Sequence, residues 1–235
     1  MVTVNNLHKK FNQNQVLKGV KLSIEEGKTT AILGPNGSGK TTLVKIILGM
    51  VLPNQGDVIF NNENIKNSWS YRKEIDYLPQ IANFPANIKV QELINMIKDL
   101  RNKPARDKEL IEYFNLGNYL NESLGNLSGG YKQKVNLLLT FMFDSPFIIL
   151  DEPTSGLDPI SLIRLKEFIK QEQAKGKTII VTSHVMNFVE EVASHVIFIL
   201  DGKVYFDGSL NSLKEQNKNV DLEHAIANIL KENNV

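Results

Sequence analysis

A short glycine-rich loop between an apolar run and an amphipathic segment is the feature that most restricts how this chain can fold. Residues 31–33 are apolar, residues 34–42 read GPNGSGKTT, and the segment that follows, to residue 49, is amphipathic. This order predicts a strand, a tight turn and a helix. Four positions match Gly-x-x-x-x-Gly-Lys-Ser/Thr, the spacing of a loop that cradles the phosphates of a nucleoside triphosphate: Gly34, Gly39, Lys40 and Thr41.

The residue types in this loop suit an anion. Glycines allow positive φ angles, so the backbone can approach a phosphate, and its N–H groups and the following helix then point at the ligand. Lys40 is expected to reach the β- and γ-phosphates, and the Thr41 hydroxyl to hold Mg²⁺. The alternative is a glycine loop that only turns a strand into a helix. The residues predicted to bind nucleotide here are Gly34, Pro35, Asn36, Gly37, Ser38, Gly39, Lys40, Thr41 and Thr42.

Two acids that follow a second apolar run are the next candidates. Residues 147–150 are apolar, and Asp151 and Glu152 come directly after them. A buried strand that ends in a carboxylate puts that group at the mouth of a sheet, where Asp151 suits metal coordination, directly or through water. Glu152 is then placed to orient or deprotonate an attacking water. The alternative is two acids in an ordinary turn before Pro153.

Three further segments carry candidate residues. His184 follows another apolar run and reads either as a sensor of the γ-phosphate or as a capping or turn histidine. Gln80 follows a short strand and a proline, and taken alone it reads as a surface glutamine. Ser128, Gly129 and Gly130 precede a helix expected from about residue 131 to 143, so they form either a second anion site or an ordinary N-cap.

The pattern of apolar residues predicts an α/β fold with three parts. Residues 2–7, 16–24 and 57–60 are rich in β-branched residues and predict an antiparallel β region, whereas residues 88–143 have helical spacing. Continuous apolar runs at 147–150, 178–182 and 196–200 are typical of parallel strands buried on both faces. The expected parts are a P-loop NTPase core with its β subdomain (1–80 and 145–210), an inserted α-helical subdomain (81–144) and a C-terminal helical extension (211–235).

Composition narrows the class of partner. The 235 residues carry a formal net charge of +1 and include no cysteine. A balanced charge gives no overall field for nucleic acid, and the lack of cysteine fits a reducing cytosol. The longest apolar-rich run, at 135–143, is about half of a membrane span. We therefore expect a soluble chain that would reach a membrane only through a partner.

In this order, the motifs closely resemble those of the nucleotide-binding subunit of ATP-binding-cassette (ABC) transporters. GPNGSGKT resembles the family's Walker A motif, LSGG at 127–130 its signature, FIILDE at 147–152 its Walker B motif, and residues 155–158 its D-loop. Gln80 stands at the position of the Q-loop glutamine and His184 at that of the switch histidine. Phe11 occupies the place of the aromatic that stacks on adenine, although it could equally be a strand aromatic packed into the β region.

The resemblance implies an ATPase that uses ATP and Mg²⁺. Two copies would dimerise head to tail around two ATP molecules, with Ser128, Gly129 and Gly130 of one copy contacting the γ-phosphate held by the other. Gln80 would join the shell of metal and water and relay the nucleotide state to a transmembrane permease. Asp158 would couple the two sites across the interface. The chain would lie in the cytoplasm, peripheral on the inner face of the plasma membrane through that permease.

One residue departs from the family pattern, because Tyr131 stands where the signature usually has glutamine. The serine and glycine donors are kept and every position needed for hydrolysis is occupied, so an active ATPase is expected. Two alternatives stay open: an ATPase of a membrane complex that transmits motion without transport, and a soluble relative that acts on ribosomes or DNA. The short helical lobe and the segment around Gly208 resemble subunits of small export or multidrug-type systems, including those of copper-site maturation for nitrous-oxide reductase.

Overall fold

The fold is built on a central, mostly parallel sheet. The computed structural model describes residues 2–216 and 221–232. The sheet has the order β10-β9-β3-β8-β7-β6, and every neighbouring pair is parallel except β9 with β10. Its strands are β3 (Thr29–Leu33), β6 (Ile75–Leu78), β7 (Phe147–Asp151), β8 (Thr178–Ser183), β9 (His195–Leu200) and β10 (Lys203–Ser209). The prediction that the three apolar runs are buried parallel strands is confirmed.

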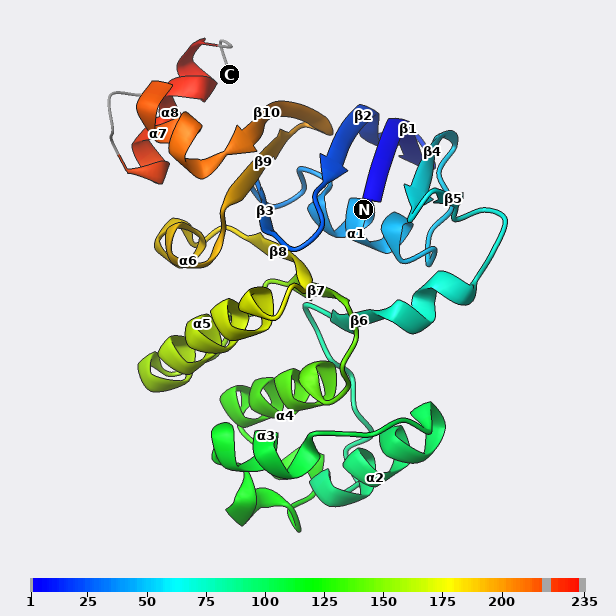
Figure 1. Cartoon of the computed structure of the whole chain (residues 1–235), viewed down its shortest axis with the longest axis vertical. Helices are drawn as coiled ribbons and strands as arrows, with labels where there is room; N and C mark the ends of the chain where they lie inside the picture. Colours follow the sequence, from blue (N-terminus) through cyan, green and yellow to red (C-terminus); the bar gives the residue numbers. More distant parts are fainter. Residues whose placement is uncertain (1, 217–220, 233–235) are drawn as a thin grey trace.

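A second, antiparallel sheet lies beside the first (Figure 1). It has the order β2-β1-β4-β5, with β1 (Val2–Phe11), β2 (Asn14–Ile24), β4 (Gln55–Phe60) and β5 (Glu63–Asn64). These strands extend beyond the predicted runs, because cross-strand pairing continues into polar residues such as Lys10 and Gln15. The predicted P-loop fold class, with a parallel sheet, an antiparallel β region and helices, is confirmed.

Helix α1 (Lys40–Ile47) packs between the two sheets. Its apolar residues share one core cluster with Val2 and Val4 of the antiparallel sheet and with alternate residues of the central sheet, such as Ile32 and Ile149. The neighbouring residues Leu33 and Ile148 point to the opposite face, where they join the second cluster with the other helices. Because successive side chains of a strand alternate, both faces of the central sheet are buried.

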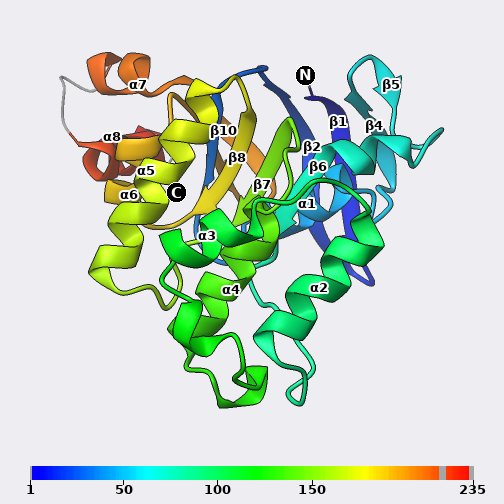
Figure 2. The ribbon, with the colours of Figure 1, turned by 60° about the horizontal axis from the view of Figure 1, so that its bottom comes forward.

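The remaining helices cover the second face and one end of the molecule. Figures 1 and 2 show α2, α3 and α4 grouped at the end away from β1 and β2, and α7 and α8 near β10. These helices are α2 (Val90–Arg101), α3 (Asp107–Tyr113), α4 (Gly129–Phe141), α5 (Pro159–Ala174), α6 (Met186–Val192), α7 (Leu210–Gln216) and α8 (Leu222–Glu232), with short 3₁₀ turns at Ser70–Glu74, Gly117–Tyr119 and Leu124–Asn126.

One predicted helix start is wrong by two residues. Helix α4 begins at Gly129 rather than near residue 131, because Ser128 caps it by accepting a hydrogen bond from the Tyr131 backbone N–H. Part of the predicted C-terminal extension, at 217–220 and 233–235, lies outside the described residues, and the division into subdomains at 80, 144 and 210 stays a prediction. Within residues 2–216 and 221–232, no helix has both the length and the apolar character to cross a bilayer.

Candidate functional site

The glycine-rich loop joins the carboxyl end of β3 to the start of α1. Gly34 has φ 152° and Gly39 has φ 108°, in a region that favours glycine. A Cβ at Gly34 would collide with the backbone oxygen of Ile199, and one at Gly39 would lie 2.7 Å from Cδ2 of Leu17. Both positions therefore favour glycine for their conformation, and Gly34 also needs it for space. This geometry lets the loop wrap closely in front of the N-terminus of α1.

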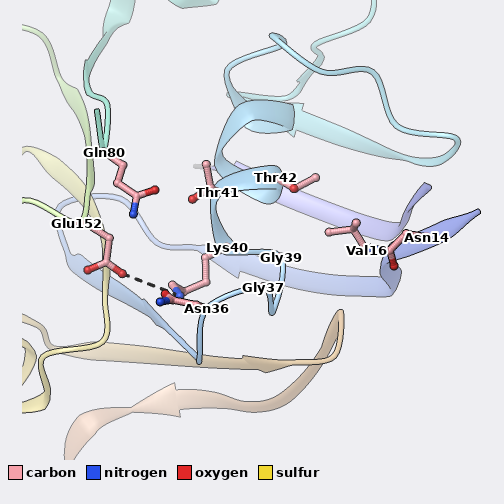
Figure 3. Close-up of a pocket in the computed structure, with 10 residues that line it drawn as sticks. All are labelled: Asn14, Val16, Asn36, Gly37, Gly39, Lys40, Thr41, Thr42, Gln80 and Glu152. Atoms are coloured by element: carbon pink, nitrogen blue, oxygen red, sulfur yellow. Dashed lines mark ion pairs between the residues drawn. The ribbon is translucent and has the colours of Figure 1, made fainter. Parts of the chain in front are cut away.

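A cavity of about 400 Å³ opens in front of this loop. Figure 3 shows Gln80 and Glu152 on one side of it and Asn14 and Val16 on the other, with the start of α1 between them. The residues that line the cavity are Asn14, Val16, Asn36, Gly37, Gly39, Lys40, Thr41, Thr42, Gln80 and Glu152. The structure thus brings together residues predicted from three separate segments.

Lys40 is the cation of this cavity. Its Nζ donates to the backbone oxygens of Gly34 at 2.7 Å and Pro35 at 3.2 Å, and lies 3.9 Å from Oε1 of Glu152 (Figure 3). Burial lowers the pKa of Lys40, and the negative charges of Glu152 and Asp151 oppose that shift. A buried ammonium held by carbonyls and one distant carboxylate has room to accept a stronger anionic partner.

Asp151 and Thr41 form the part of the site that fits a divalent cation. Oδ1 of buried Asp151 accepts hydrogen bonds from the hydroxyls of Thr182 and, at 3.4 Å, Thr41. Its second oxygen, Oδ2, is buried and has no hydrogen-bond partner among the described residues. A carboxylate with one unpartnered oxygen, whose other oxygen contacts a threonine hydroxyl, belongs to the hard oxygen donors that Mg²⁺ prefers.

Glu152 follows β7 in an unusual backbone conformation, with φ 50°. Its N–H donates to the backbone oxygen and to the hydroxyl of Thr182, both at 3.1 Å, which stabilises the turn. Oε2 lies 2.9 Å from Nδ1 of His184, while buried Oε1 has no hydrogen-bond partner within residues 2–216 and 221–232. Positive φ at a non-glycine residue is costly and is concentrated at functional sites.

His184 reaches Glu152 from the neighbouring strand. It follows β8 directly, and its side chain is 59% exposed. The capping alternative is wrong for α6, since the N-cap residue is Val185 and no side chain caps that helix. The partner of His184 is the carboxylate of Glu152, which the spacing of the sequence did not indicate.

Phe11 lies outside the cavity wall. It ends β1, is 45% exposed, and has Nζ of Lys9 at 4.7 Å from its ring centroid. The alternative that it packs into the β region is therefore wrong. Asn14 and Val16, at the start of β2, line the cavity instead. Sequence reasoning missed them, because their place depends on how β2 pairs with β1 and approaches Gly39.

The residues predicted to form a second anion site lie apart from this cavity. Ser128 and Gly130 do not line it; Gly129 lines a neighbouring cavity of about 260 Å³, together with Gln80 and Ser155. The N–H groups of Gly129 and Gly130 belong to the first turn of α4, whose N-terminus favours negative charge. The second anion site therefore stays a prediction, and the 400 Å³ cavity does not include it.

Asp158 has partners within its own chain. It caps α5 by accepting from the backbone N–H and the hydroxyl of Ser161, each at 2.8 Å, and it pairs with Nζ of Lys134 at 2.9 Å. These hydrogen bonds, from the Ser161 backbone first, lower the pKa of Asp158 well below its ordinary value. Through Lys134, Asp158 contacts helix α4, which begins at residues 128–130, hereafter the Ser128 turn.

Tyr131, the departure from the signature, packs against its own chain. Its ring lies on the ring of Tyr119, with centroids 3.9 Å apart, and Nζ of Lys134 lies 4.8 Å from its centroid. Aromatic stacking and a nearby cation both stabilise this position. Tyr131 therefore adds an aromatic side chain, packed on Tyr119, to the first turn of α4.

Known proteins share both the sequence and the fold. Residues 17–155 match the ABC transporter family. The chain is 33% identical over 223 residues to the lantibiotic transport ATP-binding protein SrtF of Streptococcus pyogenes, covering 90% of this chain and 93% of that protein. A solved ATP-binding subunit of an ABC transporter superposes with a TM-score of 0.89 at 25% identity, covering 97% of this chain and 99% of the other.

A second similar structure was solved with ADP and Pi bound. It is the ATP-binding cassette MJ0796, in a dimeric, post-hydrolysis state bound to ADP and Pi. It is similar to this chain with a TM-score of 0.80 at 26% identity, covering 89% of this chain and 99% of that one. Together with the phosphate loop, the paired acids and the signature turn, these likenesses show that the chain belongs to the ABC transporter family, as an ATP-hydrolysing subunit with a single nucleotide-binding domain.

Proposed function

We propose that two copies of this chain close head to tail around two Mg²⁺–ATP and drive a separate transmembrane permease. The observation that carries the proposal is the separation of the two anion sites: the cavity with Lys40 and Glu152 does not include the Ser128 turn. A second copy can bring its own turn to the open side of that cavity. The dimeric state of the similar cassette MJ0796 supports the same arrangement.

Within each copy, different residues of the site bind the phosphates, hold the metal ion and accept the proton. Lys40 and the N-terminus of α1 bind and orient the phosphates. Thr41 and the buried Asp151 behind it would hold Mg²⁺, and Gln80 lines the cavity with Thr41; when bound, the ion would supply positive charge for the transferring phosphoryl group. Glu152 accepts a proton from the attacking water. His184 holds Oε2 of Glu152, which leaves Oε1, 3.9 Å from Nζ of Lys40, without a hydrogen-bond partner among the described residues.

The Ser128 turn of the partner copy supplies the remaining hydrogen-bond donors to the γ-phosphate. The Ser128 hydroxyl and the N–H groups of Gly129 and Gly130 donate to it, so ATP binds more tightly to the closed dimer than to one copy. Hydrolysis and release of phosphate remove that differential contact and let the copies separate. Asp158, near the same interface, couples the two sites. Phe11 is proposed to stack on adenine when the nucleotide is bound.

The dimer is tested by size-exclusion chromatography with light scattering. In the Glu152→Gln variant, which keeps ATP uncut, ATP and Mg²⁺ should convert the monomer to a dimer. Ser128→Ala, which removes the hydroxyl and leaves the cavity intact, should require a higher ATP concentration for the same conversion. A Glu152→Gln protein that stays monomeric at saturating ATP would contradict the proposal.

The permease is expected to dock beside Gln80. Residues Ala82, Asn83, Phe84 and Ala86 line a cavity of about 160 Å³ together with residues from the turn at 124–125 and Lys132. The surface at residues 83–87 would accept a helix of the permease, so that movement of Gln80 with nucleotide reaches the membrane. This contact would place the chain on the inner face of the plasma membrane. Phe84→Asp should release the permease in a pull-down of the complex while leaving ATP binding unchanged.

Transport is the favoured work of the complex, since the relative SrtF is named for transport of a lantibiotic and matches this chain over nearly its whole length. We propose an export-type system, with cargo selected by the permease. We also propose the predicted division into a core with its β subdomain (1–80 and 145–210), a helical subdomain (81–144) and a C-terminal extension (211–235). Copurification of the permease, followed by ATP-driven transport in vesicles, distinguishes a transporter from a complex that transmits motion only.

A further inference from the structure

Helix α4 carries two buried amides on one face. Nε2 of Gln133 donates to the backbone oxygen of Pro153 at 2.9 Å, and Nδ2 of Asn136 donates to the backbone oxygen of Pro79 at 3.3 Å. Both amide residues are buried. Residues three apart on a helix lie on the same side, so a single face of α4 holds two carbonyls that come from different strand ends.

Each of these carbonyls adjoins a residue of the nucleotide cavity. Pro79 precedes Gln80 and Pro153 follows Glu152, and both Gln80 and Glu152 line the 400 Å³ cavity. A buried carbonyl needs a donor, and losing that donor costs more than the bond itself contributes. The two amides therefore set where the backbone beside Gln80 and beside Glu152 can lie.

The same helix begins at the Ser128 turn, and two further contacts fix that end. Gly130 packs so closely on Gly156 that a Cβ would lie 2.7 Å from the Gly156 backbone oxygen. One turn later, Lys134 pairs with Asp158 at 2.9 Å. Helix α4 has 13 residues, and a rigid helix can carry coupling from one end to the other. A shift at Pro79 or Pro153 would therefore be passed to the turn.

We infer that Gln133 and Asn136 are positioning residues that lock the Ser128 turn to Gln80 and Glu152 of the same chain. The inference rests on the proposed head-to-tail dimer, in which this turn serves the nucleotide of the partner copy. Filling one cavity moves the backbone beside Gln80 and Glu152, and the amides carry that displacement through α4 to the turn. The occupancy of one site thereby sets how well the other closes.

The test uses variants that remove the amide and keep the volume of the side chain. Gln133→Met and Asn136→Leu each remove one donor to a proline carbonyl. The matched control is Gln173→Met, since Nε2 of Gln173 donates to the backbone oxygen of Gly27 at 3.1 Å, outside the cavity wall. Three quantities are measured on the full chain: the affinity of the dilute monomer for a fluorescent ATP analogue, kcat and KM for hydrolysis, and the ATP concentration for half-maximal dimerisation in the Glu152→Gln background.

The expected result is a split between binding and closure. Monomer affinity should stay within about twofold, because the phosphate loop is untouched, while kcat should fall by about fivefold to tenfold and half-maximal dimerisation should need correspondingly more ATP. The control Gln173→Met should change none of the three. If Gln133→Met fails to bind the analogue because it does not fold, Gln133→Asn, which is one methylene shorter, replaces it with the same expectation.

Three outcomes would each overturn part of this account. If Glu152→Gln alone dimerises with ATP but Gln133→Met and Asn136→Leu behave like Gln173→Met, the positioning role is wrong and the dimer stands. If Glu152→Gln alone stays monomeric at saturating ATP, the dimer itself is wrong, and the inference falls with it. A loss of monomer affinity equal to the loss of kcat in a folded Gln133→Met protein also overturns the positioning role, since it would indicate general damage to the site.

Discussion

Nδ1 of His184 lies 2.9 Å from Oε2 of Glu152, although 32 positions separate the two residues. Parallel pairing of β7 with β8 places Asp151 opposite Thr182, so the residues that follow these strands emerge side by side. An ionised carboxylate only accepts hydrogen bonds, so Nδ1 carries the proton in this pair. The Nε2 atom then remains available for a ligand, and Glu152 is held in one orientation.

Replacing Glu152 by glutamine should separate binding from chemistry. Glu152→Gln keeps the size of the side chain but cannot accept a proton from water, so kcat should fall by about 10²- to 10⁴-fold. Affinity for ATP should stay within about twofold. A phosphate-release assay and an equilibrium titration measure the two quantities. The control is Glu191→Gln, which removes a surface pair with Lys166 and should leave both unchanged.

Removing His184 should slow hydrolysis by freeing the carboxylate. A hydrogen bond to a charged group contributes about 1.5–3 kcal/mol, so His184→Ala should lower kcat by about tenfold to a hundredfold. His184→Gln retains an N–H donor and should recover part of that loss. His195 forms a similar pair with Asp207 at 2.7 Å, on strands β9 and β10. His195→Gln is therefore the matched control, and an equal loss of kcat there would refute the assignment.

Lys40→Met should remove most of the stabilisation that ATP provides. It takes away the buried cation that lines the cavity, so the phosphates lose a charged hydrogen-bond donor. The parent protein should gain about 2.7 kcal/mol when ATP is at a hundredfold excess over Kd. Lys40→Met should lose most of that gain. Thermal unfolding with and without Mg²⁺–ATP measures this gain. A variant that ATP stabilises as strongly as it stabilises the parent would contradict the role of Lys40.

Glu172 should contribute stability that depends on pH. It is fully buried, and Arg106 bonds to both of its oxygens at 3.0 Å. Burial raises its pKa, but bonds from Arg106 and from two lysines outweigh burial and bring the pKa to about 2. The pKa in the folded protein is therefore lower than the ordinary pKa of a glutamate, about 4.3. The stabilisation by Glu172 is complete above about pH 4.5 and is lost as the pH falls from about 4.5 toward 2.

Glu172→Gln should therefore lower the free energy of unfolding by about 3 kcal/mol near neutral pH, since it takes a buried carboxylate away from Arg106 and from buried Lys177. The difference between variant and parent should shrink steadily below about pH 4 and vanish near pH 2. Chemical denaturation at several pH values measures it. A difference that is independent of pH would show that the charge of Glu172 does not contribute.

Much of the site could be predicted because it depends on local order along the chain. A strand, a glycine turn and a helix are consecutive from residue 29 to 47, so the loop with Lys40 and Thr41 follows from neighbours in the sequence. Asp151 and Glu152 follow from the same reasoning, because an acid at the end of a buried strand must emerge at the edge of the sheet. The start of α4 at Gly129 was missed by two residues, because the Ser128 cap extends the helix beyond its apolar pattern.

The relations between segments far apart in the chain depend on how the strands pair and the helices pack. The amino-acid sequence determined the class of fold, the phosphate loop and the acids, since these depend on local propensity and alternation of apolar residues. Strand register determined that His184 meets Glu152 and that Asn14 and Val16, rather than Phe11, line the cavity. Helix packing determined that Gln133 and Asn136 reach the carbonyls beside Glu152 and Gln80. Register and packing arise when distant segments bury apolar surface against one another, and a local pattern does not specify which polar groups that burial brings within hydrogen-bonding distance.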